Sequence, residues 1–231
     1  MIAIILNSGR GSRLGVYTKK IPKCMVDIGE HETIISRQLT ILKHCGVENI
    51  VITTGYLQDI LVDYVKQLDL GLHIDYYFND EYMTTNYIES LNRVPFRNDD
   101  VLLLHGDLVF SEEIVEDAIN FSGSCMVADS RVPLPEKDFK ARVRNGRIEK
   151  IGVDVFGKDV ISVQPLYKLT IDDWRLWKEK IAQFCEQGIR NVYAENALNE
   201  VLDVINLQKV EVNERFCGEI DNEEDLLRYK R

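Results

Sequence analysis

The amino-terminal stretch combines small residues with two cationic side chains in a pattern that suits a polyphosphate. The apolar run Ile2–Leu6 breaks into Asn7-Ser8-Gly9-Arg10-Gly11-Ser12-Arg13, and Lys23 follows behind a proline. Glycines allow close approach and positive φ, so successive backbone N–H groups can point at one anion. Arg13 and Lys23 can neutralise charge that the amides alone cannot. The pattern predicts a phosphate-binding loop, although a plain strand-to-helix turn can also contain Gly-x-Gly.

Two widespread nucleotide-binding patterns are missing from this stretch. Leu14 stands where the dinucleotide fingerprint has its third glycine, and no Gly-Lys-Ser/Thr follows as in a Walker loop. No acidic residue that could recognise a cofactor lies in a strand near position 35. A dinucleotide-dependent oxidoreductase is therefore disfavoured.

Two aspartates offer the oxygen ligands that Mg²⁺ prefers. Asp107 follows the apolar run 101–105 and a glycine, and Asp221 lies near the carboxyl-terminal end in Gly218-Glu219-Ile220-Asp221. Each also has a purely structural interpretation. Asp107 could be a turn residue or a helix cap, and Asp221 could be the N-cap of a helix opened by the acidic residues after it. The spacing alone does not bring the two carboxylates together.

Hydrophobic periodicity divides the first 130 residues into alternating strands and helices. Strands are predicted at 2–6, 49–54, 72–78, 101–105 and 124–128, and helices at 33–45, 57–68, 85–93 and 111–119. This order predicts an α/β fold with a Rossmann-like, mostly parallel sheet covered on both faces. Ligands of such sheets lie beyond the carboxyl ends of the strands. The glycine loop, Gly55-Tyr56 and Gly106-Asp107 would all meet there.

The remaining residues predict a smaller β/α lobe. Residues 140–144 and 147–151 alternate about Asn145-Gly146, which indicates a two-residue hairpin. Further strands are predicted at 160–165 and 207–212, and helices at 171–187, at 196–204 and from 221 onward. Trp174 and Trp177 are expected in the core or an interface. With no linker or internal repeat, a single domain over residues 1–231 is expected.

Composition limits the function classes further. The 231 residues carry a net charge of −10, which argues against non-specific nucleic-acid binding. The five scattered cysteines include no Cys-x-x-Cys pair, so reduced thiols are expected rather than a zinc ribbon or a disulfide framework. Without a signal-peptide pattern or a run of membrane-spanning length, a cytoplasmic protein with no membrane partner is expected. A homodimer is left open.

The complete amino-terminal string resembles the signature of a known enzyme family. Leu-Asn-Ser-Gly-x-Gly-Ser-Arg-Leu (6–14), followed by Lys-x-x-Pro-Lys-Cys-Met-Val (19–26), is similar to nucleotidyltransferases that make nucleotide-diphospho sugars and CDP-alcohols. The resemblance implies the nucleotide-diphospho-sugar transferase fold, with a loop that wraps a triphosphate. The residues thereby implied to contact nucleotide are Leu6, Asn7, Ser8, Gly9, Gly11, Ser12, Arg13, Lys23 and Asp107.

The same resemblance implies a metal-dependent reaction. It places catalytic Mg²⁺ on Asp107 and Asp221, and it gives catalytic roles to Arg13, Lys23 and Asp107. Residues 1–130 would form the nucleotide-binding half, and residues 131–231 the acceptor-binding half. A phosphate or phosphonate oxygen of the acceptor would attack the α-phosphorus of the nucleotide, and pyrophosphate would leave. That oxygen is already anionic, so no general base is required.

The block Asn79–Leu91 bears on the choice of nucleotide. It runs from a strand through acidic and aromatic residues into Thr84-Thr85-Asn86, where Thr84 or Thr85 could be an N-cap. It resembles the corresponding block of cytidylyltransferases that act on phosphocholine or on phosphonates. The resemblance implies that Thr84, Thr85 and Asn86 contact CTP. The alternatives are a sugar-1-phosphate nucleotidyltransferase using UTP, dTTP or GTP, and a nucleotide-binding regulator without activity.

The acceptor site is predicted on the second half of the chain. Tyr193, Glu195 and Asn196 could face a cationic head group by cation–π and charge contact. A primary amine, an amino-acid-like group or a polyol would fit this polar stretch equally well. Lys140, or Arg142, could hold the acceptor phosphate, since relatives use a basic residue on a strand of this lobe. CTP and a small phosphorylated acceptor are the expected binding partners.

Overall fold

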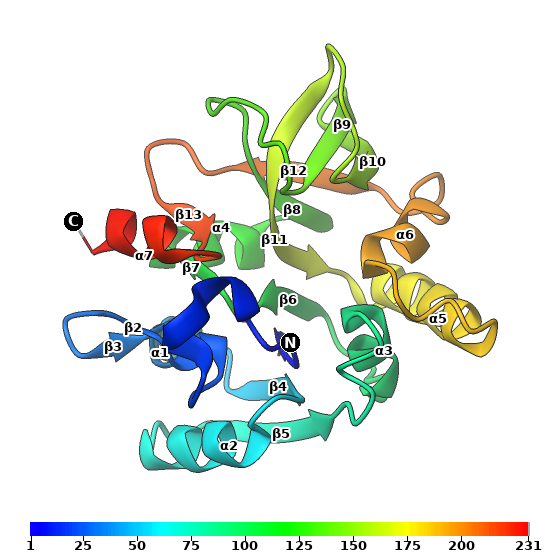
Figure 1. Ribbon diagram of the computed structural model, residues 1–231. Coiled ribbons are helices and arrows are strands. Elements are labelled where there is room, and N and C mark those ends of the chain that lie inside the picture. Colours follow the sequence, from blue (N-terminus) through cyan, green and yellow to red (C-terminus); the bar gives the residue numbers. More distant parts are fainter. Residues whose placement is uncertain (231) are drawn as a thin grey trace.

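The computed structural model describes residues 1–230 and contains one large sheet with helices on both faces (Figure 1). Its strands are β1 (Ile2–Asn7), β4 (Asn49–Thr54), β5 (His73–Phe78), β6 (Val101–His105), β8 (Ser124–Asp129), β9 (Lys140–Arg144), β10 (Arg147–Gly152), β11 (Val160–Leu169) and β12 (Leu207–Glu211). Two small sheets pair β2 (Asp27–Gly29) with β3 (Glu32–Thr33), and β7 (Leu108–Phe110) with β13 (Cys217–Glu219).

The helices lie on both sides of this sheet. They are α1 (Ile34–His44), α2 (Gln58–Gln67), α3 (Tyr87–Arg93), α4 (Glu112–Asn120), α5 (Ile171–Glu186), α6 (Ala194–Asn199) and α7 (Glu223–Tyr229). Two 3-10 segments, η1 (Ser12–Thr18) and η2 (Lys23–Met25), follow β1 directly. Neither segment was expected, because short 3-10 turns have no periodicity long enough to detect.

The strand order combines a parallel half with a closed half in which every pair except β8 with β12 is antiparallel. The order is β5-β4-β1-β6-β11-β8-β12-β10-β9, and β5, β4, β1 and β6 run parallel. β11 runs antiparallel to β6, and β9 pairs with both β10 and β11, so the last strands close on themselves. The predicted α/β class, with a Rossmann-like half and a smaller β/α lobe, is confirmed. One sheet contains strands from both sides of residue 130.

The longest strand differs from its prediction for a structural reason. β11 continues past Pro165 to Leu169 because its two ends pair with different neighbours. Residues 160–162 pair with β9, and residues 166–169 pair with β6. The register with β8 shifts between Val163 and Tyr167, and such an irregularity accommodates a proline that cannot donate to the ladder.

The predicted caps of two helices are wrong. Asn86, rather than Thr84 or Thr85, is the N-cap of α3, and Asn222, rather than Asp221, is the N-cap of α7. The side chain of each asparagine accepts backbone N–H groups of its own helix. The predicted helix 196–204 begins earlier and is shorter, as α6. Since Asn222 performs the capping, the Asp221 carboxylate is available for other contacts.

Two apolar cores lie on opposite faces of the sheet, and β1 contributes to both. Ile2 and Ile4 pack with α3, α5 and α6, whereas Ala3 and Ile5 pack with α1, α2 and α4. Side chains of a strand alternate between faces, so a continuous apolar run is what a strand covered on both sides requires. β1 is therefore fixed at the centre of the sheet, and its carboxyl end carries the glycine loop.

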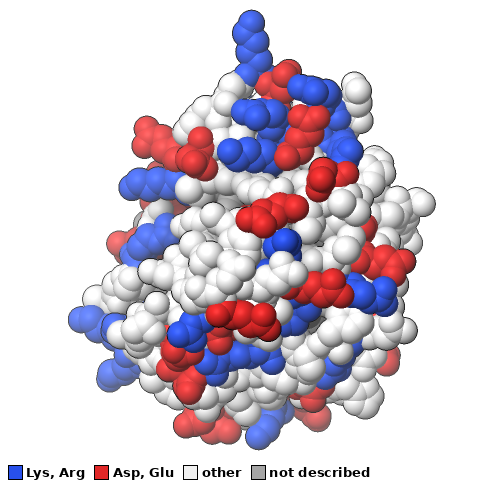
Figure 2. All heavy atoms as spheres, turned by 90° about the vertical axis from the view of Figure 1, so that its right-hand side faces the viewer, with Lys and Arg blue, Asp and Glu red and all other residues white. Residues whose placement is uncertain are grey.

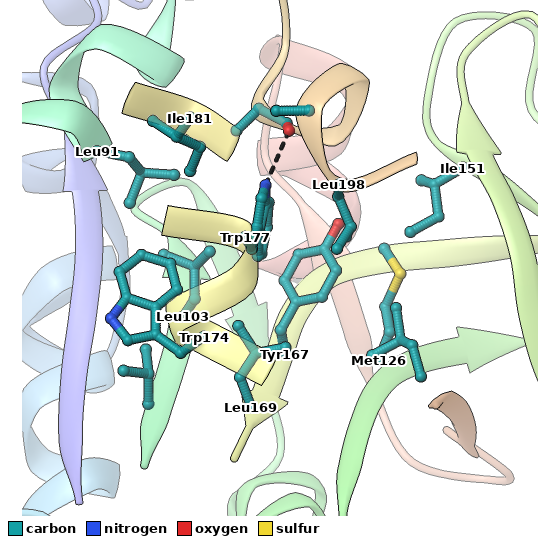
Figure 3. Close-up of a cluster of buried hydrophobic side chains, with 14 of the residues drawn as sticks. Leu91, Leu103, Met126, Ile151, Tyr167, Leu169, Trp174, Trp177, Ile181 and Leu198 are labelled. Carbon is teal, nitrogen blue, oxygen red and sulfur yellow. Dashed lines mark hydrogen bonds between the residues drawn. The ribbon is translucent and has the colours of Figure 1, made fainter. Parts of the chain in front are cut away.

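The core under α5 is built around aromatic rings (Figure 3). Trp174 and Trp177 are fully buried, and the Trp177 ring packs edge-on against Tyr167 at a centroid distance of 5.4 Å. Trp177 also donates from Nε1 to the carbonyl oxygen of Ala194 at 3.0 Å. The expectation that both tryptophans lie in the core is confirmed, and Trp177 ties α5 to the start of α6.

Acidic and basic side chains are interspersed over the face that carries α3, α5 and α6 (Figure 2). Within residues 1–230, no helix has the length and apolar content needed to cross a bilayer.

Replacing Trp177 with phenylalanine should cost more stability than replacing Trp174 with phenylalanine. Both changes remove similar apolar area from one buried helix face. Only Trp177→Phe also loses the hydrogen bond to the carbonyl oxygen of Ala194 in α6, which adds about 1 kcal/mol to the loss. Urea titration of both variants measures the difference. Equal losses would show that the bond to Ala194 contributes nothing to stability.

Candidate active site

Three neighbouring parallel strands end at the same edge, where glycines let the connecting turns pack closely together. A β-carbon on Gly106 would lie 1.7 Å from Asn7 Oδ1, and one on Gly55 would lie 2.4 Å from the carbonyl oxygen of Ser8. Gly106 donates its backbone N–H to the carbonyl oxygen of Leu6 at 3.0 Å. These close approaches press the turns after β4 and β6 against the end of β1.

The loop after β1 is folded against the segment that carries Lys23. Gly11 has φ +60°, and a β-carbon there would lie 2.7 Å from Cβ of Lys23. Thr18 donates from Oγ1 to the Gly11 carbonyl oxygen at 3.0 Å, which closes the loop on itself. Pro22 precedes η2 in an extended conformation and directs Lys23 back under the loop. The glycine is thus required both for its conformation and for the space that Lys23 occupies.

Lys23 joins the two aspartates that the family resemblance implied as metal ligands. Its Nζ lies 2.5 Å from Asp107 Oδ2 and 2.6 Å from Asp221 Oδ1. Arg13 Nη1 lies 2.7 Å from Asp221 Oδ2. The structure therefore brings together side chains from three distant parts of the chain at the mouth of the glycine loop.

Two structural devices hold the aspartates in place. β7 and β13 pair antiparallel, with Gly218 opposite Val109, and Ile220 donates its N–H to the Asp107 carbonyl oxygen at 2.9 Å. This pairing carries Asp221 to Asp107. On the other side, the buried Gln38 of α1 donates from Nε2 to carbonyl oxygens of His105 and Leu108, at 2.9 Å and 2.7 Å. Gln38 thereby fixes the turn that presents Asp107.

The charges at this centre stabilise one another. Burial favours the neutral form of Lys23, but the charges of Asp107 and Asp221 outweigh it and raise the pKa of Lys23. Burial also acts to raise the pKa of Asp107, but the charges of Lys23 and His105 outweigh it, and the pKa of Asp107 is lowered. Lys23 and Asp107 are accordingly both ionised at neutral pH.

A cavity of about 270 Å³ opens between this centre and the glycine loop. Most of the residues implied to bind triphosphate line it, namely Leu6, Asn7, Gly9, Gly11, Ser12, Arg13, Lys23 and Asp107, together with Asp221. The cavity is lined by cationic side chains and small residues whose backbone can approach a ligand. This composition suits an anion with several charged groups.

A smaller cavity of about 130 Å³ adjoins the first along β1. Ser8, Thr85 and Asn86 line it, as the resemblance implied for nucleotide contacts, and Leu6 and Gly9 are shared with the first cavity. Asn79 donates from Nδ2 to Thr85 Oγ1 at 3.1 Å and to Ser90 Oγ at 3.0 Å, which holds the wall of this cavity. Thr84 is not part of this wall, because it is exposed and its hydroxyl bonds to the Glu81 carbonyl oxygen.

A third cavity, of about 540 Å³, lies on the other side of the two aspartates. Asp107, Asp221 and Arg13 are common to it and to the first cavity. Its other lining residues are aromatic or charged: Tyr87, His105, Glu136, Lys137, Asp138, Phe139, Tyr193 and Glu219, with Val153. The Tyr193 ring lies 5.8 Å from Tyr87 and 5.2 Å from Phe139, centroid to centroid. The cavity thus has an aromatic wall and a largely acidic rim.

Three of the four predicted acceptor contacts require correction. Lys140 is buried and donates its ammonium hydrogens to carbonyl oxygens of residues 135, 136 and 138, so it supports the loop beside the third cavity rather than facing into it. Glu195 is buried and accepts the hydroxyl hydrogens of Tyr87 and Tyr167. Asn196 is exposed and lines none of the three cavities. Tyr193 alone lies where it was expected.

Sequence reasoning missed several residues of the third cavity. Glu219 could have been found, because it lies two residues before Asp221 and side chains at i and i+2 of a strand share a face. His105 stands in the same relation to Asp107, and its Nδ1 lies 3.3 Å from Glu219 Oε1. Tyr87 and Phe139 carry no local signal, since aromatic residues near strand ends are usually core residues.

The carboxylates fit the Mg²⁺ that the family resemblance implies. Asp107 Oδ1 is buried and has no hydrogen-bond partner within residues 1–230. Asp107 and Asp221 both reach the same ammonium group, so one cation can contact both. Hard oxygen donors from few carboxylates, beside a cavity suited to phosphate, are what Mg²⁺ takes in proteins.

Comparison with known proteins gives relatives over the whole chain. The family model described as the MobA-like NTP transferase domain matches residues 3–199. CTP:phosphoglutamine cytidylyltransferase of Campylobacter jejuni is 27% identical, with 98% of this chain and 98% of the relative covered. Choline-phosphate cytidylyltransferase of Haemophilus influenzae is 26% identical, with 97% and 94% covered. The solved CTP:phosphocholine cytidylyltransferase of Streptococcus pneumoniae has a TM-score of 0.81 at 20% identity, with 99% and 97% covered, and so shares the fold.

Replacing Glu195 with glutamine should destabilise the protein by about 1–3 kcal/mol. Each carboxylate oxygen of Glu195 accepts one phenol hydrogen, whereas the nitrogen end of a glutamine amide cannot accept a hydrogen bond. Asn196→Ala is the matched control at the neighbouring, exposed position and should have little effect. Chemical denaturation of the two variants measures both losses. A stable Glu195→Gln protein would contradict the assigned role of this carboxylate.

Proposed function

This chain belongs to the MobA-like NTP transferase domain family, and on that premise we propose that it transfers CMP from CTP to a small phosphate or phosphonate monoester. The products are a CDP- or CMP-linked compound and pyrophosphate. The choice of CTP is supported by the relatives from Campylobacter jejuni and Haemophilus influenzae, whose names describe cytidylyltransferases. It is also supported by the block 79–91, which lines the cavity beside the glycine loop.

The observation that carries the proposal is the position of Lys23 between Asp107 and Asp221. Nucleotidyl transfer to an anionic acceptor is opposed by repulsion between negative groups and by the need for alignment. A site for it must therefore concentrate positive charge where the phosphates meet. Lys23 and Arg13 supply that charge at the junction of the first and third cavities.

Each cavity then has a role in the proposed reaction. The triphosphate lies in the first cavity, the nucleoside extends into the second beside Thr85 and Asn86, and the acceptor enters the third. Asp107 and Asp221 would hold Mg²⁺, which when bound neutralises phosphate charge. Lys23, Arg13 and the loop amides stabilise the charge that develops on the phosphates, and one such preorganised contact contributes about 3–4 kcal/mol.

The lining of the third cavity favours an acceptor that carries a cationic nitrogen. The rings of Tyr87, Phe139 and Tyr193 form one wall, and Asp138 and Glu219 add negative charge. A cation over aromatic faces gains about 0.5–2 kcal/mol, and it also offsets the acidic rim. The proposed acceptors are therefore phosphate or phosphonate monoesters with an amine, an amino-acid-like group or a quaternary ammonium.

Replacing Asp107 with asparagine should lower kcat/KM with CTP by about 10²- to 10³-fold, because the carboxylate that would hold Mg²⁺ and that positions Lys23 is lost while the side-chain shape is kept. Pyrophosphate release measures this, with each of the four nucleoside triphosphates, Mg²⁺ and a panel of amine-bearing phosphate and phosphonate acceptors.

Asp63→Asn, at an exposed position of α2, is the control and should leave turnover unchanged. A fully active Asp107→Asn enzyme would remove the proposed role of Asp107. Turnover of hexose 1-phosphates with UTP, dTTP or GTP, in place of CTP, would instead support a sugar-1-phosphate nucleotidyltransferase.

Replacing Tyr193 with alanine should raise KM for a cationic acceptor by about 2- to 30-fold and leave KM for CTP unchanged, because the ring lies in the third cavity only. Tyr193→Phe keeps the ring and should resemble the wild type. Steady-state kinetics with both substrates varied tests this. An equal effect on a neutral acceptor of similar size would argue against cation recognition.

A further inference from the structure

Both oxygens of the Asp221 carboxylate are already engaged by cationic side chains. Lys23 Nζ lies 2.6 Å from Oδ1, and Arg13 Nη1 lies 2.7 Å from Oδ2. Lys23 also lies 2.5 Å from Asp107 Oδ2, whereas Asp107 Oδ1 is buried and unpartnered among the residues described. Asp107 therefore has an oxygen free of any cation, whereas each oxygen of Asp221 already faces a cationic side chain.

A divalent cation held by both aspartates needs an oxygen from each. Bonding to either oxygen of Asp221 would place it directly beside Lys23 or Arg13 unless that side chain withdraws. The three cations also repel one another at such short range, and the partial burial of Lys23, 13% exposed, weakens screening by solvent. Lys23 and the divalent cation therefore compete for the same pair of carboxylates.

The withdrawing side chains have a second anionic partner within the same cavity. Lys23 and Arg13 both line the first cavity, together with Gly9 and Gly11 of the loop. The proposed function puts the triphosphate there. Phosphate oxygens accept charge-assisted hydrogen bonds from ammonium and guanidinium groups as readily as carboxylates do.

Resting on the proposed function, we infer that Lys23 and Arg13 couple the binding of divalent cation to the binding of triphosphate. They neutralise the two aspartates when no nucleotide is bound, and they move to the phosphates when CTP enters. The freed carboxylate oxygens then accept the metal. Lys23 is thus a positioning residue for the metal as well as a phosphate contact.

This exchange implies that the divalent cation binds tightly only when the nucleotide is also bound. The free divalent cation binds weakly by itself, because it must displace a side chain that has nowhere else to go. With the nucleotide present, the same displacement creates new ion pairs. Since Lys23 and the metal compete for the same carboxylates, removing Lys23 should strengthen metal binding in the absence of nucleotide.

The test is a titration with Mn²⁺ in the absence of nucleotide, with free Mn²⁺ measured by its electron paramagnetic resonance signal. Lys23→Met should bind Mn²⁺ about 5- to 150-fold more tightly than the wild type. Arg13→Gln should bind more tightly by a smaller factor, and because Arg13 is 67% exposed this variant keeps the fold even if Lys23→Met does not. Lys23→Arg retains the charge and should bind as weakly as the wild type.

Lys137→Met is the matched control, because Lys137 lines the neighbouring third cavity but forms no ion pair with either aspartate among the described residues. It should bind Mn²⁺ as the wild type does. If Lys137→Met raised the Mn²⁺ affinity as much as Lys23→Met, a general effect of net charge would explain both results, and the proposed exchange would be overturned. If neither Lys23→Met nor Arg13→Gln tightened binding, the exchange would be overturned.

The failure of this inference differs from the failure of the proposed function. Calorimetry with a non-hydrolysable CTP analogue and Mn²⁺ on the wild-type protein separates them. Binding of the analogue, with no difference in free-metal affinity among the variants, would overturn the exchange alone. No binding of the analogue would overturn the proposed function as well.

Discussion

Two ionised carboxylates that lie side by side repel each other, and the cationic side chains that relieve this repulsion organise the candidate active site. Asp107 and Asp221 are carried together by the pairing of β7 with β13, two strands of three residues each. Their repulsion is relieved by Lys23, whose ammonium contacts both, and by Arg13. The glycine at position 11 is needed because the Lys23 side chain passes beneath it. The loop, the lysine and the acids are therefore one unit.

Features set by local sequence could be predicted, whereas features set by distant contacts could not. The apolar run of β1, the glycine loop and Lys23 lie within 25 residues, and strand-and-helix alternation predicted the sheet around them. The meeting of Asp221 with Asp107 depends on strands too short to detect, so only a family resemblance implied it. Lys140 shows the same limit. Its strand was predicted, but the carbonyl oxygens that accept hydrogen bonds from its ammonium group lie in an irregular loop.

The third cavity is assembled from both halves of the chain, which explains why its residues escaped sequence reasoning. Tyr87 and His105 come from the parallel half, Phe139 and Tyr193 from the smaller lobe. Glu195 lies behind this wall and accepts hydroxyl hydrogens from Tyr87 and from the core residue Tyr167. A buried carboxylate satisfied in this way fixes the Tyr87 ring, which borders both the second and the third cavities. The shape of both cavities is thereby tied to the packing of the core beneath them.

The most direct measurement is a crystal structure with a non-hydrolysable CTP analogue and Mn²⁺, in which anomalous scattering locates the metal. The account predicts a Mn²⁺ peak bonded to oxygens of Asp107 and Asp221, with the triphosphate along residues 8–13 and Lys23 turned toward the phosphates. A metal bound away from these two acids, or a nucleotide seated outside the glycine loop, would contradict it.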